Sequence, residues 1–233
     1  MAGSLMKKLP SGSKSDNKQK DAPNNVSRAT ASRLVLYLRE LQQQGRSGHS
    51  TVRSVSLGKQ LGINDSQVRR DLGSLGLTGR PGVGYSVDEL THSIRGILGT
   101  DRKWGVILIG VGHLGQALAG YRGFSEQGFH IVAAFDNAKE KIGTKVMGVC
   151  IQSLDTLEQI LKKKDVQLAI VAVPAFEAQQ VVDRLGQAGV EGILNFAPVN
   201  VDLKHGNMSV VNVDLALELQ RLAFEVVKKS DDQ

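Results

Sequence analysis

The chain of 233 residues is 41% apolar, enough for one large core or two small ones, and it contains no apolar run of about 18 residues that would span a membrane. Its basic start lacks the apolar segment of a secretory signal, and its single cysteine excludes an internal disulfide or a cysteine-based metal site. We therefore expect a cytoplasmic protein without a metal. The net charge of +6 is uneven: residues 1–100 hold 15 Lys and Arg against 7 Asp and Glu, and residues 101–233 hold 14 against 16. This asymmetry indicates two modules, of which the first faces a polyanion.

The first residues have the composition of a disordered tail. Residues 1–27 are rich in Lys, Ser, Asn and Gly and too poor in apolar residues to offset the entropy of ordering. An amphipathic pattern follows, in which Leu34, Leu38 and Leu41 recur at spacings of four and three. It predicts a helix that ends near Gly45.

A helix-turn-helix comes next. Two short helices, at about residues 57–61 and 66–75, flank a turn at residues 62–64 that contains Gly62, which is typical of this motif. Residues 76–87 then hold four glycines and a Pro-Gly pair around Arg80, which suits a hairpin whose tip closely approaches another molecule. We therefore predict a winged-helix DNA-binding domain over residues 28–88. Residues 89–103 are predicted to be a linking helix that Gly99 terminates.

From Gly105 the sequence has the pattern of an α/β domain. Apolar strands are predicted at residues 106–109, 131–135, 167–173 and 191–196, with a short edge strand at residues 146–151. Strands of this kind alternating with helices indicate a parallel sheet covered on both faces, so we predict a Rossmann-like doubly wound sheet over residues 104–211. Cys150 has apolar neighbours and is expected to be a small buried hydrophobe.

A dinucleotide fingerprint lies directly after the first strand. In Gly110-Val111-Gly112-His113-Leu114-Gly115, the first glycine permits a tight turn, the second lets backbone N–H groups approach a pyrophosphate, and the third lets the helix pack closely. Asp136 closes the second strand, and a carboxylate there binds the adenosine ribose and favours NAD(H) over NADP(H). The alternative is a Gly-rich turn that only connects a strand to a helix.

The sequence favours a regulator over an enzyme. None of its five histidines is paired with an obvious acid, and the 129 residues from Gly105 leave no room for a substrate domain. A nucleotide site joined to a DNA reader is typical of a ligand-controlled regulator. Two alternatives stay open: an NAD-dependent oxidoreductase with a DNA-binding appendage, and a DNA-binding regulator that senses another nucleotide such as coenzyme A.

Nine stretches of the sequence carry a family resemblance. They are residues 33–39, 67–72, 79–85, 109–115, 134–136, 141–143, 172–175, 192–198 and 213–216. In these stretches and in their order, the chain resembles the Rex family of redox-sensing transcriptional repressors. The resemblance implies a repressor that binds a palindromic operator and is released by NADH, with NAD competing. The chain departs from the family pattern at residues 72–76, which lack aromatic residues, and at Arg80-Pro81, where two basic residues are common.

The candidate DNA contacts lie in the helix-turn-helix and in the wing, which is the hairpin predicted at residues 76–87. They are Ser66, Gln67, Arg69, Arg70, Arg80, Arg53 and Lys59. Residues at the start of a recognition helix contact bases in the major groove, where Gln67 suits an adenine edge and the two helix arginines suit guanine or phosphate. Arg80 is placed to enter the minor groove or clamp phosphates. For each arginine the alternative is an ordinary solvated charge.

The candidate cofactor contacts extend beyond the glycine loop. They are Gly110, Val111, Gly112, His113, Leu114, Gly115, Asp136, Lys141, Val173, Pro174, Ala175, Asn195, Phe196, Ala197, Pro198 and Tyr121. An apolar pocket formed by the loops after the third and fourth strands favours the neutral reduced nicotinamide over the oxidised cation. The resemblance further implies a redox switch formed by Arg39, Tyr121 and Asp214. Without it, these three are a surface charge, a core residue and a helix N-cap.

The last segment, residues 212–233, is predicted to be a dimerisation helix. Its apolar residues, among them Leu215, Leu219 and Phe224, occur almost all round the helix, so it needs cover on more than one side. We expect a homodimer in which this helix packs against the partner and is exchanged. A dimer also suits the two half-sites of a palindromic operator.

Overall fold

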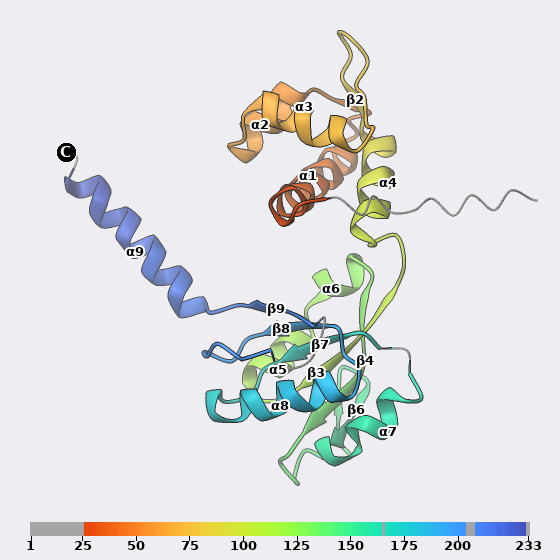
Figure 1. Cartoon of the computed structure of the whole chain (residues 1–233), viewed down its shortest axis with the longest axis vertical. Helices are drawn as coiled ribbons and strands as arrows, with labels where there is room; N and C mark the ends of the chain where they lie inside the picture. Colours follow the sequence, from red (N-terminus) through yellow and green to blue (C-terminus); the bar gives the residue numbers. More distant parts are fainter. Residues whose placement is uncertain (1–25, 165, 204–207, 232–233) are drawn as a thin grey trace, which may run out of the picture. The chain divides into compact units, whose positions relative to one another are not determined.

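The computed structural model describes residues 26–164, 166–203 and 208–231. The chain divides into two compact units, residues 1–99 and residues 100–233, whose elements are drawn in Figure 1. The predicted tail lies outside the described residues except for Val26 and Ser27, and both of these belong to the first unit. Val26 packs against its core, and the Ser27 hydroxyl accepts a hydrogen bond from the Thr30 N–H at 3.1 Å, capping the first helix.

The described residues of the first unit, 26–99, form four helices and a two-stranded ribbon. Its elements are α1 (Arg28–Arg46), β1 (Thr51–Val52), α2 (Ser54–Leu61), α3 (Asp65–Ser74), β2 (Tyr85–Ser86) and α4 (Val87–Leu98). Helices α2 and α3 form the predicted helix-turn-helix, with Gly62 in the left-handed conformation at the end of α2 and Asn64 capping α3. Strands β1 and β2 pair antiparallel, and Arg80 bridges to Gly84 in the wing.

Helix α4 is part of the first unit and not a linker. Its residues Leu90 and Ile94 are buried in the same cluster as Leu34 of α1 and Leu57 of α2. An amphipathic pattern shows that a helix has a buried face but not which core covers it, so the predicted boundary at residue 88 differs from the division at residue 99. Gly99 ends α4 in the left-handed conformation, as expected.

The second unit is built on a seven-stranded sheet. Its strands are β3 (Trp104–Ile109), β4 (Phe129–Asp136), β5 (Lys145–Val146), β6 (Val149–Ser153), β7 (Leu168–Val171), β8 (Gly192–Asn195) and β9 (Ser209–Asn212). The strand order is β5-β6-β4-β3-β7-β8-β9, and every pair is parallel except β5 and β6. Strand β9 was not predicted, because its four residues are largely exposed and show no apolar pattern.

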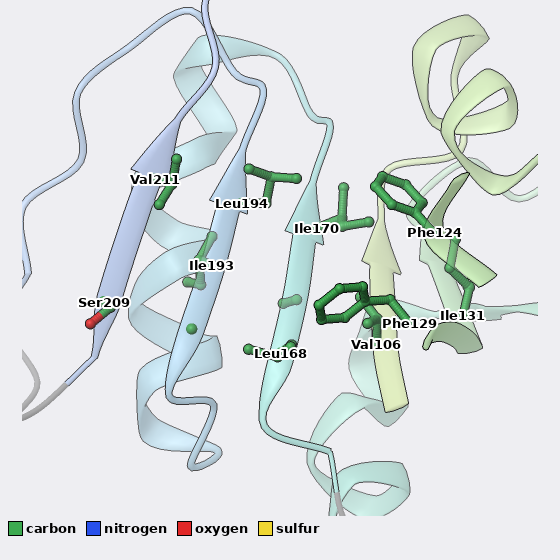
Figure 2. Close-up of a pocket in the computed structure, with 12 residues that line it drawn as sticks. Val106, Phe124, Phe129, Ile131, Leu168, Ile170, Ile193, Leu194, Ser209 and Val211 are labelled. Atoms are coloured by element: carbon green, nitrogen blue, oxygen red, sulfur yellow. The ribbon is translucent and has the colours of Figure 1, made fainter. Parts of the chain in front are cut away.

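Helices cover the two faces of this sheet unequally. The helical elements are α5 (His113–Ala119), α6 (Arg122–Glu126), η1 (Leu154–Thr156), α7 (Leu157–Leu161), α8 (Ala175–Gln187) and α9 (Leu215–Asp231). Helices α7 and α8 bury one face, and side chains of α5 and α6 pack on the other. On this second face, the side chains of β7, β8 and β9 line an apolar hollow of about 400 Å³ (Figure 2). The expected cover of both faces is therefore incomplete within one chain.

Cys150 is exposed, and the prediction that it is buried was wrong. Strands β5 and β6 form an antiparallel hairpin in which Cys150 lies opposite Lys145. Successive side chains of a strand point to opposite faces, so the burial of Ile151 in the sheet leaves Cys150 facing outward.

Candidate functional site

The glycine cleft, a cleft of about 310 Å³, opens where β3 and β7 end. The chain leaves β3 for β4 on one side and later returns to β7 on the other, and ligands of doubly wound sheets bind at such a reversal of strand order. The glycine loop joins β3 to α5, and a second loop joins β7 to α8. The cleft is lined by Ile109, Gly110, Gly112, Asp136, Asn137, Ala138, Lys141, Leu154, Ala172, Val173, Pro174, Glu177 and Val181.

Two glycines of the loop are required by the fold, and a third is not. Gly110 has a φ of 89°, and a Cβ there would meet the carbonyl oxygen of Ala172. A Cβ on Gly115 would meet the carbonyl oxygen of Gly110, so α5 packs this closely only with glycine at that position. Gly112 has an ordinary φ of −77°, and a Cβ there would meet no neighbouring atom. The space beside Gly112 belongs to the cleft and not to the packing of the loop.

Asp136, at the end of β4, is hydrogen-bonded to the glycine loop. Its Oδ2 accepts hydrogen bonds from the Val111 N–H at 2.8 Å and from Lys141 Nζ at 3.0 Å, and its Oδ1 accepts one from the Ala138 N–H at 2.8 Å. Burial raises the pKa of this carboxyl, but the N–H groups of Ala138 and Val111 and the Lys141 ammonium outweigh it, so the pKa lies below its ordinary value. Asp136 is therefore a carboxylate, 11% exposed, at the wall of the cleft.

The structure brings together part of the predicted cofactor set. The cleft-lining members are Gly110, Gly112, Asp136, Lys141, Val173 and Pro174. Of the other predicted members, Val111 of the loop and Gly115 of α5 are buried. His113 and Leu114 are exposed on α5, and Ala175 begins α8.

Sequence reasoning missed several cleft residues, among them Leu154, Glu177 and Val181. They come from η1 and from the first half of α8, and these elements follow β6 and β7 at the same edge of the sheet. The signal that would have found them is topological: parallel neighbours end at one edge, so the segments that follow them meet there.

The loop after β8 does not line this cleft. Asn195 is fully buried, and its Nδ2 donates to the carbonyl oxygens of Ala197 at 3.3 Å and Val199 at 3.1 Å and to Asn212 Oδ1 at 2.9 Å. Its Oδ1 accepts the Ala197 N–H at 3.0 Å, so Asn195 fixes its own loop and joins it to β9. The other predicted members of this loop are Phe196, packed against the sheet, Ala197, buried, and Pro198, exposed.

The three switch candidates have different surroundings. Tyr121 is 60% exposed, stacks edge-on against Phe124 with ring centroids 5.1 Å apart, and lines a hollow of about 230 Å³ distinct from the glycine cleft. Asp214 Oδ1 accepts the N–H groups of Ala216 at 2.9 Å and Leu217 at 3.3 Å, as a helix cap does. Arg39 is an exposed residue of α1.

In the first unit, a buried carboxylate ties α3 to α1. Asp71 of α3 is 4% exposed and accepts hydrogen bonds from Arg33 Nε at 2.6 Å and Nη2 at 2.8 Å, from the Tyr37 hydroxyl at 2.9 Å and from Gln67 Nε2 at 2.8 Å. Burial raises the pKa of Asp71, but the bonds from Arg33, Gln67 and Tyr37 outweigh it and lower the pKa below its ordinary value. Burial and the bond to Asp71 raise the pKa of the Tyr37 hydroxyl.

The candidate DNA contacts of α3 are partly held by its own side chains. Arg69 Nη1 donates to Asp65 Oδ2 at 2.6 Å and to Ser54 Oγ at 3.3 Å, and Arg70 Nη2 donates to Gln67 Oε1 at 2.7 Å. Both arginines are exposed, whereas Ser66 and Gln67 are half-buried.

The remaining candidates lie on α2 and around the wing. Arg53 Nη2 donates to the Gly82 carbonyl oxygen at 3.2 Å, which ties the N-cap of α2 to the wing. Arg80 is exposed in the wing, and Lys59 is exposed on α2. Among the described residues, no group of three or more His, Cys, Asp or Glu is placed to hold a metal, and no helix is long and apolar enough to cross a bilayer.

Two family descriptions match the chain. Residues 25–73 match a family described as the N-terminus of a putative DNA-binding protein, and residues 101–199 match a family described as a CoA binding domain. They fall on the helix-turn-helix and on the sheet with its glycine loop, respectively.

The chain is similar to curated redox-sensing transcriptional repressors named Rex. It is 45% identical to that of Rhodopirellula baltica, with 88% of this chain and 86% of the relative covered. It is 42% identical to that of Carboxydothermus hydrogenoformans, with 86% and 96% covered. The chain belongs to the Rex family of redox-sensing transcriptional repressors. Membership confirms the predicted repressor function and excludes the oxidoreductase alternative.

Solved Rex-family structures have the same fold. The structure of RSP in complex with beta-NAD+ and operator DNA matches with a TM-score of 0.82 at 32% identity, covering 88% of this chain and 94% of RSP. RSP in complex with beta-NADH matches with a TM-score of 0.79 at 30% identity, covering 88% and 96%. These matches confirm the predicted fold class, a winged helix-turn-helix followed by a Rossmann-like sheet.

The bonds to Asp71 lead to a prediction about stability. Tyr37→Phe removes one donor from a buried carboxylate, so we expect the free energy of unfolding to fall by about 1–3 kcal/mol in urea at neutral pH. Tyr85→Phe, in the wing of the same unit, is the matched control and is expected to change it by less than about 0.5 kcal/mol. Equal effects of the two substitutions would contradict the role of the Tyr37 hydroxyl.

Proposed function

We propose that this Rex protein is a cytoplasmic homodimer that binds a palindromic DNA operator and releases it when NADH enters the glycine cleft, with NAD+ competing. The observation that carries the proposal is the glycine cleft with its ionised Asp136, on the same chain as a basic helix-turn-helix. The RSP structures, which hold beta-NAD+ with operator DNA or beta-NADH, support both ligands.

The residues of the cleft suit a pyridine dinucleotide. The open side of Gly112 leaves room for a pyrophosphate against the loop, and the Asp136 carboxylate suits the ribose hydroxyls and repels a 2′-phosphate. Val173 and Pro174 offer an apolar wall to the nicotinamide, which favours the neutral reduced ring over the cationic oxidised one. Phe196, Ala197 and Pro198, which follow the neighbouring strand β8, do not line the cleft, so we leave them out of this wall.

On the DNA side, α3 has the features of a major-groove reader. Arg69 and Arg70 are exposed on its surface, and Arg80 is exposed in the wing, where it suits the minor groove or a phosphate. Arg53 and Lys59 suit phosphates nearby. We also keep Arg39, Tyr121 and Asp214 as the switch that links nucleotide state to DNA binding, on the family resemblance alone.

Two uncovered apolar surfaces support the homodimer. Helix α9 exposes its large apolar side chains, including Leu219 at 68% and Phe224 at 66%. The second face of the sheet carries the apolar hollow of Figure 2, where Ile170, Leu194 and Val211 point to the same side. Contiguous exposed apolar surface marks an interaction site, so we propose that a second copy buries both, with α9 exchanged between the two chains.

A gel mobility-shift experiment on a palindromic operator tests the function. NADH is expected to abolish the shifted band, whereas NAD+, NADPH and coenzyme A leave it. Because linkage is reciprocal, NADH must bind the operator-bound dimer more weakly than the free dimer, by the factor with which it weakens operator binding. Release by coenzyme A alone would establish the alternative of a different sensed nucleotide.

The loop glycines give a prediction that separates binding from folding. Gly112→Ala is expected to leave the unfolding midpoint unchanged and to weaken NADH at least about tenfold, because its Cβ would occupy the side at which the pyrophosphate approaches. Gly115→Ala is expected to lower the free energy of unfolding by about 1–3 kcal/mol, because its Cβ meets the Gly110 carbonyl oxygen. Fluorescence titration and urea unfolding measure the two effects. Unchanged NADH affinity in Gly112→Ala would contradict the placement of the pyrophosphate.

A charged side chain on α9 tests the dimer. Leu219→Glu with Phe224→Glu places two carboxylates on the proposed interface, so sedimentation velocity is expected to show monomers and operator affinity to fall. Gln220→Glu, which adds a charge at a polar position of the same helix, is the matched control. A dimer that persists in the double variant would place the interface elsewhere.

A further inference from the structure

We propose that Gln67 is a positioning residue, which holds Arg70 in place from the buried Asp71, and that it does not itself read an adenine. The inference rests on the proposed docking of α3 in the major groove and reassigns one residue within it. All three residues belong to α3, and the Gln67 side chain is hydrogen-bonded to both Asp71 and Arg70.

Both polar atoms of the Gln67 amide form hydrogen bonds within α3. Its Nε2 donates to Asp71 Oδ1 at 2.8 Å, and its Oε1 accepts from Arg70 Nη2 at 2.7 Å. A glutamine reads adenine with the same two atoms, the oxygen toward N6 and the nitrogen toward N7. The amide keeps a second N–H and a second lone pair. To present Nε2 and Oε1 side by side to a base edge, however, it would have to turn its NH2 group away from Asp71, which would leave that carboxylate with one donor fewer.

The orientation of the amide follows from its inner neighbour. Asp71 is ionised and can only accept, so the face of Gln67 toward it must carry the NH2 group. The amide oxygen then faces away from Asp71. It can accept a hydrogen bond but cannot donate one, and the Arg70 guanidinium is the donor that it binds. The inner end of this chain is rigid, since Asp71 is also held by two bonds from Arg33 and one from Tyr37.

The two arginines of α3 differ in the charge of the groups that they bind. Arg69 is paired with Asp65 in the first turn of the helix, so part of its charge is neutralised before DNA arrives. Arg70 is held by a neutral amide and keeps its full charge. One of its N–H groups is bonded to Gln67, and the guanidinium retains donors for the two acceptors of a guanine edge. Arg70 is therefore the base reader that this arrangement prepares.

A double-mutant cycle on operator affinity tests the inference. Gln67→Met keeps the length of the side chain and removes both bonds, and Arg70→Ala removes the reader. Each single variant is expected to weaken operator binding by about tenfold or more. The double variant is expected to bind within about twofold of Arg70→Ala, because Gln67 acts only through Arg70. Fluorescence anisotropy with a labelled operator measures all four affinities.

A second readout is independent of any change in folding. On a set of operators altered one base pair at a time, Gln67→Met and Arg70→Ala are expected to lose preference at the same base pair. Relative affinities within one preparation are unaffected by an inactive fraction. Gln43→Met, the same chemical change at an exposed position of α1, is the matched control and is expected to leave affinity and base preference unchanged.

The outcomes separate this inference from the function on which it rests. Additive losses in the cycle, or loss of preference at different base pairs, mean that Gln67 contacts DNA itself and overturn the inference alone. Unchanged affinity in Gln67→Met also overturns it. If Arg69→Ala, Arg70→Ala and Arg80→Ala all bind the operator like the unsubstituted protein, α3 and the wing do not contact DNA, and the proposed DNA face fails together with the inference.

Discussion

The close approach of α5 to the end of β3 is the constraint on which the nucleotide side of this repressor depends. Two glycines, Gly110 and Gly115, allow it, because any side chain at either position would meet a carbonyl oxygen. The loop after β3 and the loop after β7 start at the same edge of the sheet. Because the chain continues from these two strands in opposite directions across the sheet, a cleft forms between the two loops. Asp136 then holds the loop through the Val111 N–H, so one carboxylate serves both the shape and the charge of the cleft.

The first unit uses the same physical device. Asp71, like Asp136, is a shielded carboxylate whose hydrogen bonds outweigh the cost of burial, and the pKa of each is lowered. A lowered pKa in the folded state means that each group stabilises the fold above its unfolded pKa of about 3.9 and loses that contribution as the pH falls through the folded value. Near neutral pH both are fully charged. Each fixes a segment for which we propose an anionic ligand, the glycine loop in one unit and α3 in the other.

The sequence predicts those parts of the molecule that depend on local pattern. Helix-turn-helix, strands and glycine loop were found because apolar spacing, caps and the Gly-x-Gly-x-x-Gly spacing act over a few residues. The errors arise where long-range packing decides: α4 joins the first core, Cys150 faces outward at a sheet edge, and β9 has no apolar pattern. Cleft residues such as Glu177 and Val181 become neighbours of the glycine loop only through the strand order. The bonds of Gln67 are local, to residues three and four positions along α3, but residue type alone does not show that its amide is already bonded there.

The two units and the uncovered apolar surfaces have to be considered together if a nucleotide is to control DNA binding. A ligand shifts an equilibrium only by the difference in its affinity for two states, and a shift from 1:99 to 99:1 requires about 5.5 kcal/mol. The proposed apolar wall would distinguish NADH from NAD+ within the cleft, and that preference alone supplies no coupling to α3. Coupling needs an element with two arrangements that both sites bias. In the proposed dimer we infer that this element is the interface formed by α9 and the open face of the sheet, because rotation of subunits about an interface is a recurrent way for proteins to change between two discrete arrangements.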